Sequence, residues 1–486
     1  MIYTLHIVNI LNIILAFVFQ VIFVKKLGAT FKTDAYYLSM TILQFVNFTV
    51  VGFITDLYIR IYNDIKVKDE EQAKTFSNAV FTLVLILGLV LSLTVFTLAP
   101  LIVKVFAAGF SADQVAFTTS FLRILSLSIL FTFLITVINS TLNASFYILI
   151  TYLTNLITPL FNILAILFLV DKFGIISLIY AFVAASAITF IVLIIYLINK
   201  SGVSVVNPFV NKDVRRLLKQ NIPLRIGILV YLIRSPATTN IISYFPPGYI
   251  TLYNYAERII LVLHDISNSI ILQILYVKSC KLLSKGDIPG LKSLMTATVR
   301  VNNLFFILLT LPVIVFFVDV FRFLFSDKLS VDQIKVVFFL FVALLPFYLL
   351  MTIELPFTYI TMAMKKGVML LKTAIVFTLI YIVLILSGIK YLGIYAIPAG
   401  LLVAQIFNSA MYIKFVNDQL KILDKQIITT IFVFILLLSG LILTNAYLKL
   451  LFDWAIYLNI IWAALILMMV LKYRIFGFAH IKEQIQ

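Results

Sequence analysis

Residues 76–104 read FSNAVFTLVLILGLVLSLTVFTLAPLIVK, and the first ionisable side chain in this stretch is Lys104 at its end. An α-helix needs about 20 predominantly apolar residues to cross the hydrocarbon core of a bilayer. This stretch exceeds that length without a charge in its interior, so it predicts a transmembrane helix.

Similar apolar segments lie on both sides of this stretch along the whole chain. Hydrophobic residues make up 63% and charged residues 12% of the 486 residues, against about 45–50% and about 25% in soluble proteins. The sequence therefore predicts an all-α polytopic membrane protein with about fourteen transmembrane helices, and 199–217 and 278–300 are its longest polar linkers. The predicted spans are residues 6–27, 37–58, 76–104, 119–143, 146–170, 174–198, 218–243, 249–275, 301–325, 335–363, 367–388, 392–414, 427–447 and 452–471.

Residues that carry enzyme or metal chemistry are scarce. The chain has one cysteine, Cys280, and three histidines, which argues against a disulfide framework and a cysteine metal cluster. It contains no H-E-x-x-H motif, no Walker lysine loop and no G-x-G-x-x-G motif, so the usual zinc, nucleotide and dinucleotide sites are not indicated. We expect no enzyme, no catalytic residue, no metal, no cofactor and no nucleic-acid partner.

The net charge of +17 is distributed unevenly between the two ends of the predicted helices. With fourteen spans, both termini lie on the same side, and the loops on that side hold 22 Lys and Arg against 10 on the other. Cytoplasmic loops are enriched in Lys and Arg. Both termini are therefore predicted to be cytoplasmic.

An internal repeat relates two parts of the chain. Thr33-Asp-Ala-Tyr-Tyr37 matches Thr251-Leu-Tyr-Asn-Tyr255 at an offset of 218 residues, and Ser111-Ala-Asp-Gln-Val115 matches Ser330-Val-Asp-Gln-Ile334 at an offset of 219. The offset spans six helices, so the two halves share one orientation, as in parallel transporter repeats that rock around a central cavity. We expect an N-lobe at 1–199, a C-lobe at 200–425 and two additional helices at 426–486.

Three arginines within the predicted spans are the expected substrate contacts. Arg225 and Arg234 lie in the seventh span and Arg258 in the eighth. At 1.5 Å per residue, Arg234 and Arg258 are expected at similar depth. Like charges in a low dielectric repel unless an anion lies between them, and paired guanidinium groups suit a phosphate. Arg258, Arg234 and Arg225 are therefore predicted to bind a diphosphate.

A structural interpretation of the same charges remains open. Arg225 and Asp265 fall at similar depth on adjacent helices and are able to pair, and Glu257 is placed to neutralise Arg234. We expect Glu257 and Asp265 to act as counter-ions rather than as substrate contacts. His264 is expected to be a packed polar residue.

Other polar residues inside the spans suggest further roles. Glu354 lies two residues before Pro356, and a carboxyl beside a helix kink is a possible ion- or proton-coupling group. The alternative is a carboxyl that is kept protonated or hydrogen-bonded. Pro236 is expected to kink the seventh helix near Arg234. In the first two helices, Gln20 and Asn47 are predicted to line the cavity.

Several short segments together resemble the MurJ/MviN family of lipid II flippases, within the multidrug/oligosaccharidyl-lipid/polysaccharide exporter superfamily. The segment between the first two helices is similar to that family's in its Gly-Ala and Thr-Asp-Ala, and Tyr255-Ala-Glu-Arg258 is similar to its Tyr-Ala-Asp/Glu-Arg signature. The resemblance runs over most of the chain. The matching segments are Leu27–Tyr37, Ala99–Ile102, Ala108–Phe110, Leu122–Ile124, Leu142–Ala144 and Tyr255–Arg258.

The resemblance implies a V-shaped pair of six-helix lobes, a central cationic cavity for a lipid diphosphate, and a groove for the polyprenyl tail at the last two helices. The family arginine of the eighth-helix signature carries over to Arg258. The family's helix-one Arg-Asp pair aligns with Phe19 and Gln20, and its helix-two arginines align with Val46 and Asn47. The cationic site is thus reduced in the N-lobe, and Arg234 is expected to compensate.

These observations predict a flippase that moves a polyprenyl-diphosphate-linked saccharide, such as lipid II, from the inner to the outer leaflet by alternating access. We expect a monomer in the bacterial inner membrane whose partners are the lipid-linked saccharide and membrane lipids. The coupling ion, or use of the membrane potential, stays open. One alternative is a flippase for O-antigen or capsule repeat units. Another is a cation-coupled MATE-like exporter, for which buried carboxylates in the N-lobe would be expected.

Overall fold

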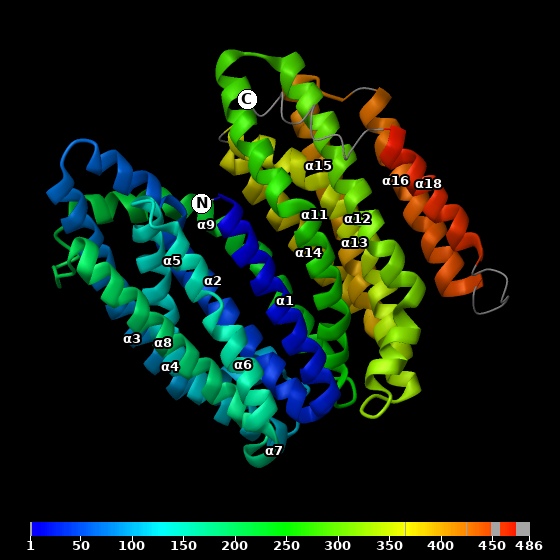
Figure 1. The fold of residues 1–486 in the computed structure, drawn as a ribbon, viewed down its shortest axis with the longest axis horizontal. Helices are drawn as coiled ribbons and strands as arrows, with labels where there is room; N and C mark the ends of the chain where they lie inside the picture. The colour runs from blue at the N-terminus through cyan, green and yellow to red at the C-terminus, as the bar shows by residue number, and fades with distance from the viewer. Residues whose placement is uncertain (1, 365, 424, 449–456, 473–486) are drawn as a thin grey trace. The chain divides into compact units, whose positions relative to one another are not determined.

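Helices make up every regular element of the described structure, which confirms the predicted all-α class (Figure 1). The computed structural model describes residues 2–364, 366–423, 425–448 and 457–472. The elements are α1 (Ile2–Leu27), α2 (Phe31–Lys66), α3 (Glu70–Phe106), α4 (Ala112–Ala144), α5 (Ile148–Thr154), α6 (Ile157–Phe168), α7 (Val170–Phe173), α8 (Ile176–Ser201), α9 (Lys212–Leu232), α10 (Arg234–Ile242), α11 (Tyr249–Lys285), α12 (Ile288–Phe325), α13 (Val331–Ala363), α14 (Gly367–Leu392), η1 (Gly393–Tyr395), α15 (Ala396–Leu420), α16 (Lys425–Ile442), η2 (Leu443–Leu448) and α18 (Leu458–Lys472).

Among the described residues, ten helices are long and apolar enough to cross a membrane, or eleven if the bent α11 counts as one span. One of the ten, Gly367–Leu420, contains both α14 and α15. The predicted seventh span is divided between α9 and α10, and α18 has 15 residues in the described part. The chain is thus a multi-pass membrane protein, and the number fourteen stays a prediction.

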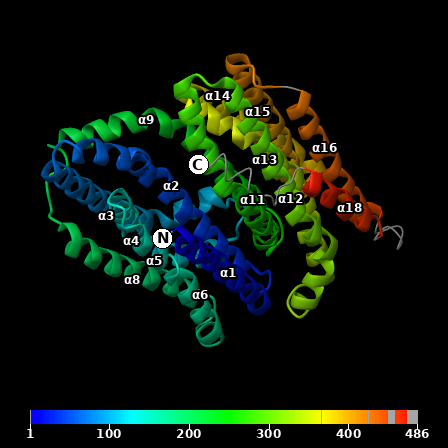
Figure 2. The same cartoon turned by 45° about the horizontal axis from the view of Figure 1, so that its top comes forward.

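The helices group into two compact units. The first comprises residues up to Thr251 together with Asp327–Leu329, and the second comprises Leu252–Ser326 and the part from Ser330 onward. In the first unit, α4 packs between α3 and α8. In the second, α15 packs against α13 and α14. Figures 1 and 2 both show α18 running beside α16. These contact units differ from the predicted lobes, because α9 and α10 belong to the first unit. The lobe boundary at residue 199 stays a prediction.

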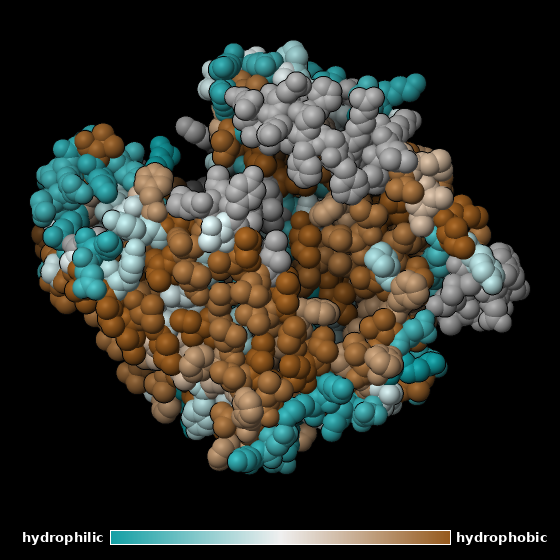
Figure 3. All heavy atoms as spheres, in the orientation of Figure 1, coloured by the Kyte–Doolittle hydropathy of each residue, from teal (hydrophilic) through white to brown (hydrophobic). Residues whose placement is uncertain are grey.

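The surface of the helices suits contact with lipid. On the face shown in Figure 3, hydrophobic residues cover most of the helix sides, whereas hydrophilic residues gather toward the helix ends. Large apolar side chains such as Leu93 and Ile460 are 65% and 66% exposed. A soluble protein rarely exposes extended apolar surface of this kind, so lipid is the natural solvent for these faces.

The internal repeat is visible in matching helices of the two units. α3 and α12 have 37 and 38 residues, and α4 and α13 both have 33. The repeated Ser-x-Asp-Gln segments begin α4 and α13. In each, the serine hydroxyl accepts a bond from the backbone N–H of the glutamine, and the glutamine side chain accepts one from the serine N–H. Two capping boxes of one kind start equivalent helices.

Both predicted polar linkers were too long. α11 continues to Lys285 and α12 begins at Ile288, so most of 278–300 is helical. α9 begins at Lys212, inside the predicted linker 199–217. Asn211 and Asp287 accept hydrogen bonds from backbone N–H groups of the following first turns and so cap the two helices. Charged residues are compatible with a capped helix in water, so hydrophobicity alone misplaced these helix ends.

Candidate functional site

The start of α11 is held by a carboxylate from α2. Asp34 is 2% exposed and accepts hydrogen bonds from the N–H of Gly248 at 2.5 Å and from the N–H of Thr251 at 2.8 Å. The Thr251 hydroxyl also lies 2.6 Å from Asp34 and 2.9 Å from the Thr33 hydroxyl. Asp34 thus caps α11 from another helix, where its negative charge complements the helix dipole. The first threonines of the two repeat segments, Thr33 and Thr251, are therefore in contact.

Two glycines near Asp34 allow close contacts between backbone segments. Gly248 has φ +99°, and a Cβ there would lie 2.8 Å from the carbonyl oxygen of Ala29. Gly28 has φ +61°, and a Cβ there would lie 2.8 Å from the carbonyl oxygen of Lys328. Both positions combine a left-handed conformation with a close approach that only glycine tolerates. We call Gly28, Ala29, Asp34, Gly248 and Thr251 the clasp.

Arg225 of α9 lies against the backbone of α2. Its side chain is 7% exposed, and Nη2 donates to the carbonyl oxygen of Phe48 at 2.7 Å. Gly52 makes room for the guanidinium, since a Cβ there would lie 0.9 Å from Nη2. The Phe48 carbonyl has a second lone pair beyond its helical bond, and a glycine one turn later leaves that lone pair accessible. A fixed positive charge therefore sits beside the middle of α2.

Replacing Gly52 with alanine should displace the Arg225 guanidinium and destabilise the protein by roughly 1–3 kcal/mol, because a buried charged donor loses its acceptor. In a double-mutant cycle with Arg225→Met, Gly52→Ala should cost little once the guanidinium is gone. The measurement is thermal unfolding of the purified protein in detergent. Gly388→Ala is the control, since its Cβ would meet no atom closer than 3.4 Å. Equal destabilisation by Gly52→Ala in both backgrounds contradicts the assignment.

Arg234 occupies the predicted break in the seventh helix. α9 ends at Leu232 and α10 begins at Arg234, so the helix is interrupted at Ile233. Pro236 accounts for this interruption, because it has no N–H to donate to the carbonyl of Leu232 and its ring crowds that carbonyl, whereas a kink of the helix axis stays a prediction. The Arg234 side chain is half-buried, with its guanidinium 5.2 Å from the centre of the Tyr231 ring.

The predicted site residues of α11 have different surroundings. Arg258 is exposed, and the described residues provide no ion pair for it. The neighbouring Glu257 accepts hydrogen bonds from the hydroxyls of Tyr253 at 3.3 Å and Tyr348 at 3.4 Å. Two tyrosines thus orient the carboxylate that precedes Arg258 in the sequence.

His264 and Asp265, which follow Arg258 on α11, differ in exposure. His264 is 5% exposed, and its ring centre lies 5.5 Å from that of Tyr348, as expected for a packed residue. The Asp265 side chain is 72% exposed, 3.6 Å from Nδ1 of His264. Asp265 therefore presents its carboxylate on the surface of the second unit.

Glu354 lies inside the second unit, 4% exposed. Its carboxylate accepts hydrogen bonds from the Thr358 hydroxyl and from Nε2 of Gln405 at 3.4 Å. The same Gln405 nitrogen lies 3.3 Å from the Ser409 hydroxyl. Neutral donors from α13 and α15 thus surround a buried carboxyl, and Gln405 is a partner that the sequence did not indicate.

Gln20 and Asn47, the predicted polar residues of the first two helices, are each held by a neighbour. The Gln20 amide donates to the Tyr37 hydroxyl at 2.9 Å, and the Thr132 hydroxyl donates to the Asn47 side chain at 3.1 Å. Both side chains are half-buried. Gln20, Asn47, Arg225 and Arg234 belong to the first unit, whereas Glu257, Arg258, Asp265 and Glu354 belong to the second.

Comparisons with known proteins agree with this fold. The family model described as "Lipid II flippase MurJ" matches residues 5–468. A solved structure of lipid II flippase MurJ in an inward closed conformation superposes with a TM-score of 0.77 at 21% identity, over 99% of both chains. An inward-facing MATE-family multidrug resistance transporter of the MOP superfamily superposes with a TM-score of 0.74 at 15% identity, over 84% of this chain and 94% of that one. A comparison with curated proteins gives no match.

Proposed function

The chain belongs to the MurJ lipid II flippase family, and from this premise we propose that it moves a polyprenyl-diphosphate-linked saccharide of the lipid II type from the inner to the outer leaflet by alternating access. The observation that carries the proposal is the exposed Arg258, inside a membrane helix, in the segment Tyr255-Ala-Glu-Arg258. A guanidinium in this setting is costly unless it meets an anion, and the diphosphate supplies one.

Substrate binding in this proposal rests on Arg258, Arg234 and Arg225. Arginine forms two parallel hydrogen bonds to phosphate oxygens. Arg225 is held beside Phe48, the residue after Asn47, and so supplies a positive charge next to α2, where Asn47 itself is neutral. Its position supports the idea that α9 and α10 replace cationic groups absent from the first two helices.

The remaining polar residues take supporting roles in the proposal. Glu257 and Asp265 act as counter-ions, and Gln20 and Asn47 contribute neutral hydrogen-bonding groups. The protein works as a monomer in the bacterial inner membrane. Both termini lie in the cytoplasm, and the Lys and Arg content of the loops supports this orientation. The reaction it carries out is transport, with no catalytic step.

The last helix pair is proposed to accompany the polyprenyl tail. η2, which continues α16, is joined to α18 by hydrogen bonds between the side chains of Asn445 and Asn459, at 2.8 Å and 3.2 Å. Trp462 lies so close to α16 that a Cβ on Gly440 would be 2.3 Å from its ring. Paired amides and close small-residue packing hold membrane helices together. The described helices α16 and α18 would thereby present a stable apolar surface to the tail.

Glu354 is the proposed coupling residue. We expect Glu354→Gln to keep the contacts to Thr358 and Gln405, and so the fold, but to lower ion- or potential-driven flipping about tenfold because the ionisable group is lost. The measurement is the flipping rate in proteoliposomes with and without an imposed pH, sodium or potential gradient. Ser409→Ala, which removes the hydroxyl beside the Gln405 amide, is the control. A Glu354→Gln protein with wild-type response to every gradient would assign Glu354 a purely structural role.

The proposed function is tested with purified full-length protein in vesicles that contain fluorescent lipid II. A membrane-impermeant quencher reports the lipid II that reaches the outer leaflet. We expect the protein to accelerate crossing of lipid II but not of a fluorescent phosphatidylcholine. Crossing at the rate of protein-free vesicles would contradict the proposal.

Two alternative substrates enter the same assay. A polyprenyl-diphosphate-linked O-antigen or capsule unit tests whether the saccharide is of another type. The structural similarity to a multidrug resistance MATE transporter supports a second candidate, a cation-coupled MATE-like drug exporter, and a fluorescent drug tests it. Transport of the drug without lipid II would favour this exporter.

A further inference from the structure

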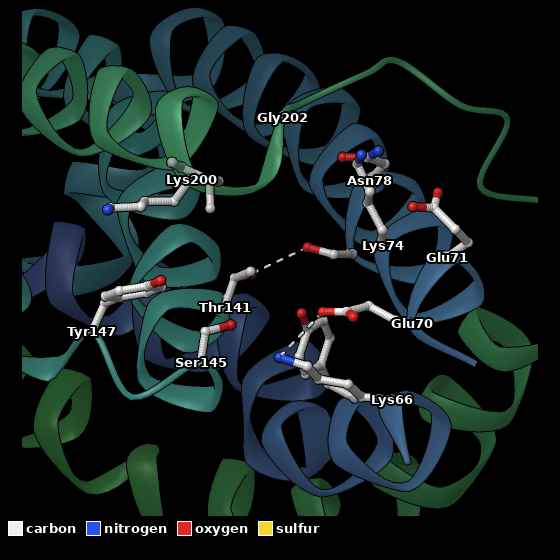
Figure 4. Close-up of a pocket in the computed structure, with 13 residues that line it drawn as sticks. Lys66, Glu70, Glu71, Lys74, Asn78, Thr141, Ser145, Tyr147, Lys200 and Gly202 are labelled. Carbon is white, nitrogen blue, oxygen red and sulfur yellow. Dashed lines mark hydrogen bonds and ion pairs between the residues drawn. The ribbon is translucent and has the colours of Figure 1, made fainter. Parts of the chain in front are cut away.

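A pocket of about 250 Å³ lies in the first unit, where the ends of α2, α3, α4 and α8 meet (Figure 4). Its wall includes Lys66 at the end of α2, Lys74 near the start of α3 and Lys200 at the end of α8. Three positive side chains from three helices therefore line one small pocket, and the amine of Lys200 points away from those of Lys66 and Lys74 (Figure 4).

The lysines of this pocket are only weakly neutralised. Lys66 lies 3.8 Å from Glu70, whose side chain is 80% exposed, and such a surface pair contributes little. Lys200 lies 5.5 Å from the centre of the Tyr147 ring. In the described part of the chain, no carboxylate lies within ion-pair distance of Lys74 or Lys200. Glu70 and Glu71 also line the pocket, so its wall holds three positive and two negative side chains, an excess of one positive charge.

Hydroxyl groups stand at the inner end of the pocket. The Tyr58 hydroxyl lies 2.9 Å from that of Ser77 and 2.7 Å from that of Thr141, and Ser77 and Thr141 are 3.3 Å apart. Ser77 and Thr141 line the pocket, and Thr141 is 3% exposed. Hydroxyls both donate and accept, so this cluster is able to turn a donor toward a bound oxyanion.

A lipid-facing apolar surface begins next to the lysines. On α8, Ile195 and Ile198 are 54% and 52% exposed, and Lys200 follows them at the helix end. The pocket therefore lies where an acyl chain along α8 would end in its phosphate. Its volume is smaller than a typical site for a drug-sized molecule and suits a headgroup with its chains outside.

We propose that this pocket binds the phosphate group of an anionic phospholipid from the leaflet on the side of the chain termini. The lysines of α2, α3 and α8 supply the charge, the hydroxyl cluster supplies hydrogen bonds, and the exposed face of α8 accommodates the chains. This site is independent of the proposed flipping reaction.

The test measures binding of phosphatidylglycerol and phosphatidylcholine to the full-length protein in detergent by native mass spectrometry. We expect Lys74→Gln/Lys200→Gln to weaken phosphatidylglycerol binding about 25-fold, since each lysine near a lipid phosphate contributes roughly fivefold. Lys74→Arg/Lys200→Arg should retain binding. The control Lys68→Gln/Lys212→Gln removes the same charge from exposed lysines that do not line the pocket.

Loss of phosphatidylglycerol in the pocket variant alone, with no competition by millimolar inorganic phosphate, supports the proposal. Equal loss in the pocket variant and in the control overturns it, because general surface charge would then explain binding. Displacement of the lipid by inorganic phosphate, with no preference over phosphatidylcholine, also overturns it and indicates a soluble phosphate compound instead.

Discussion

Arg258→Ala is expected to lower the rate of lipid II flipping about 100-fold while leaving the protein folded. The side chain is exposed on α11, so its removal opens no core cavity. Truncating one partner of a desolvated, hydrogen-bonded charge pair typically costs about 2–5 kcal/mol, and this loss falls on the complex with the diphosphate. Flipping in proteoliposomes measures the effect directly.

Two variants separate the role of the guanidinium from that of charge alone. Arg258→Lys keeps the charge but loses the paired hydrogen bonds, and we expect it to fall between alanine and wild type. Arg322→Ala removes an exposed arginine at the end of α12 and should leave flipping unchanged. If Arg258→Ala and Arg322→Ala flip lipid II equally well, Arg258 does not bind the substrate.

Asp34→Ala is expected to release the start of α11. Three hydrogen bonds to one buried carboxylate disappear, and the N–H groups of Gly248 and Thr251 lose their acceptor. Bonds to a charged group contribute about 1.5–3 kcal/mol each, partly recovered when water enters. Amide hydrogen exchange should therefore accelerate about 100-fold at residues 248–252, because local opening becomes easier.

The clasp prediction has a close control. Asp113 also lies in the first turn of a helix, α4, but it is exposed, so Asp113→Ala should leave exchange at residues 248–252 unchanged. Asp34→Asn keeps the shape and should give an intermediate effect, since an amide oxygen still accepts one bond. Unchanged protection in Asp34→Ala would show that packing, rather than the carboxylate, holds α11.

Local chemistry explains which parts of this structure were predictable. Membrane spans follow from the hydrophobicity of consecutive residues, as in 76–104. Pro236 predicts the break at Ile233, because proline removes a hydrogen bond within its own helical turn. The Ser-x-Asp-Gln segments match the capping-box pattern, which predicts the start of a helix from sequence alone. The helix ends beyond the membrane were missed, because α11 continues through charged residues to Lys285 and α9 begins at Lys212, after the capping residue Asn211.

Contacts between residues far apart in the chain could not be predicted from the sequence. Asp34 was noticed only as part of a repeat, and its role depends on the backbone of Gly248, 214 positions away. Nothing local to Gly52 indicates that an arginine of α9 occupies its missing side-chain volume. The Gln405 partner of Glu354 likewise depends on how α13 packs against α15. Such pairings arise from tertiary packing, which a single sequence does not encode in any short segment.

The most direct test of the account is rescue of a bacterium depleted of its own lipid II flippase by this protein, with membrane expression verified. The account predicts growth with the wild-type chain and with Arg322→Ala, and none with Arg258→Ala. Failure of the well-expressed wild-type chain to restore growth would contradict lipid II as the substrate in that host.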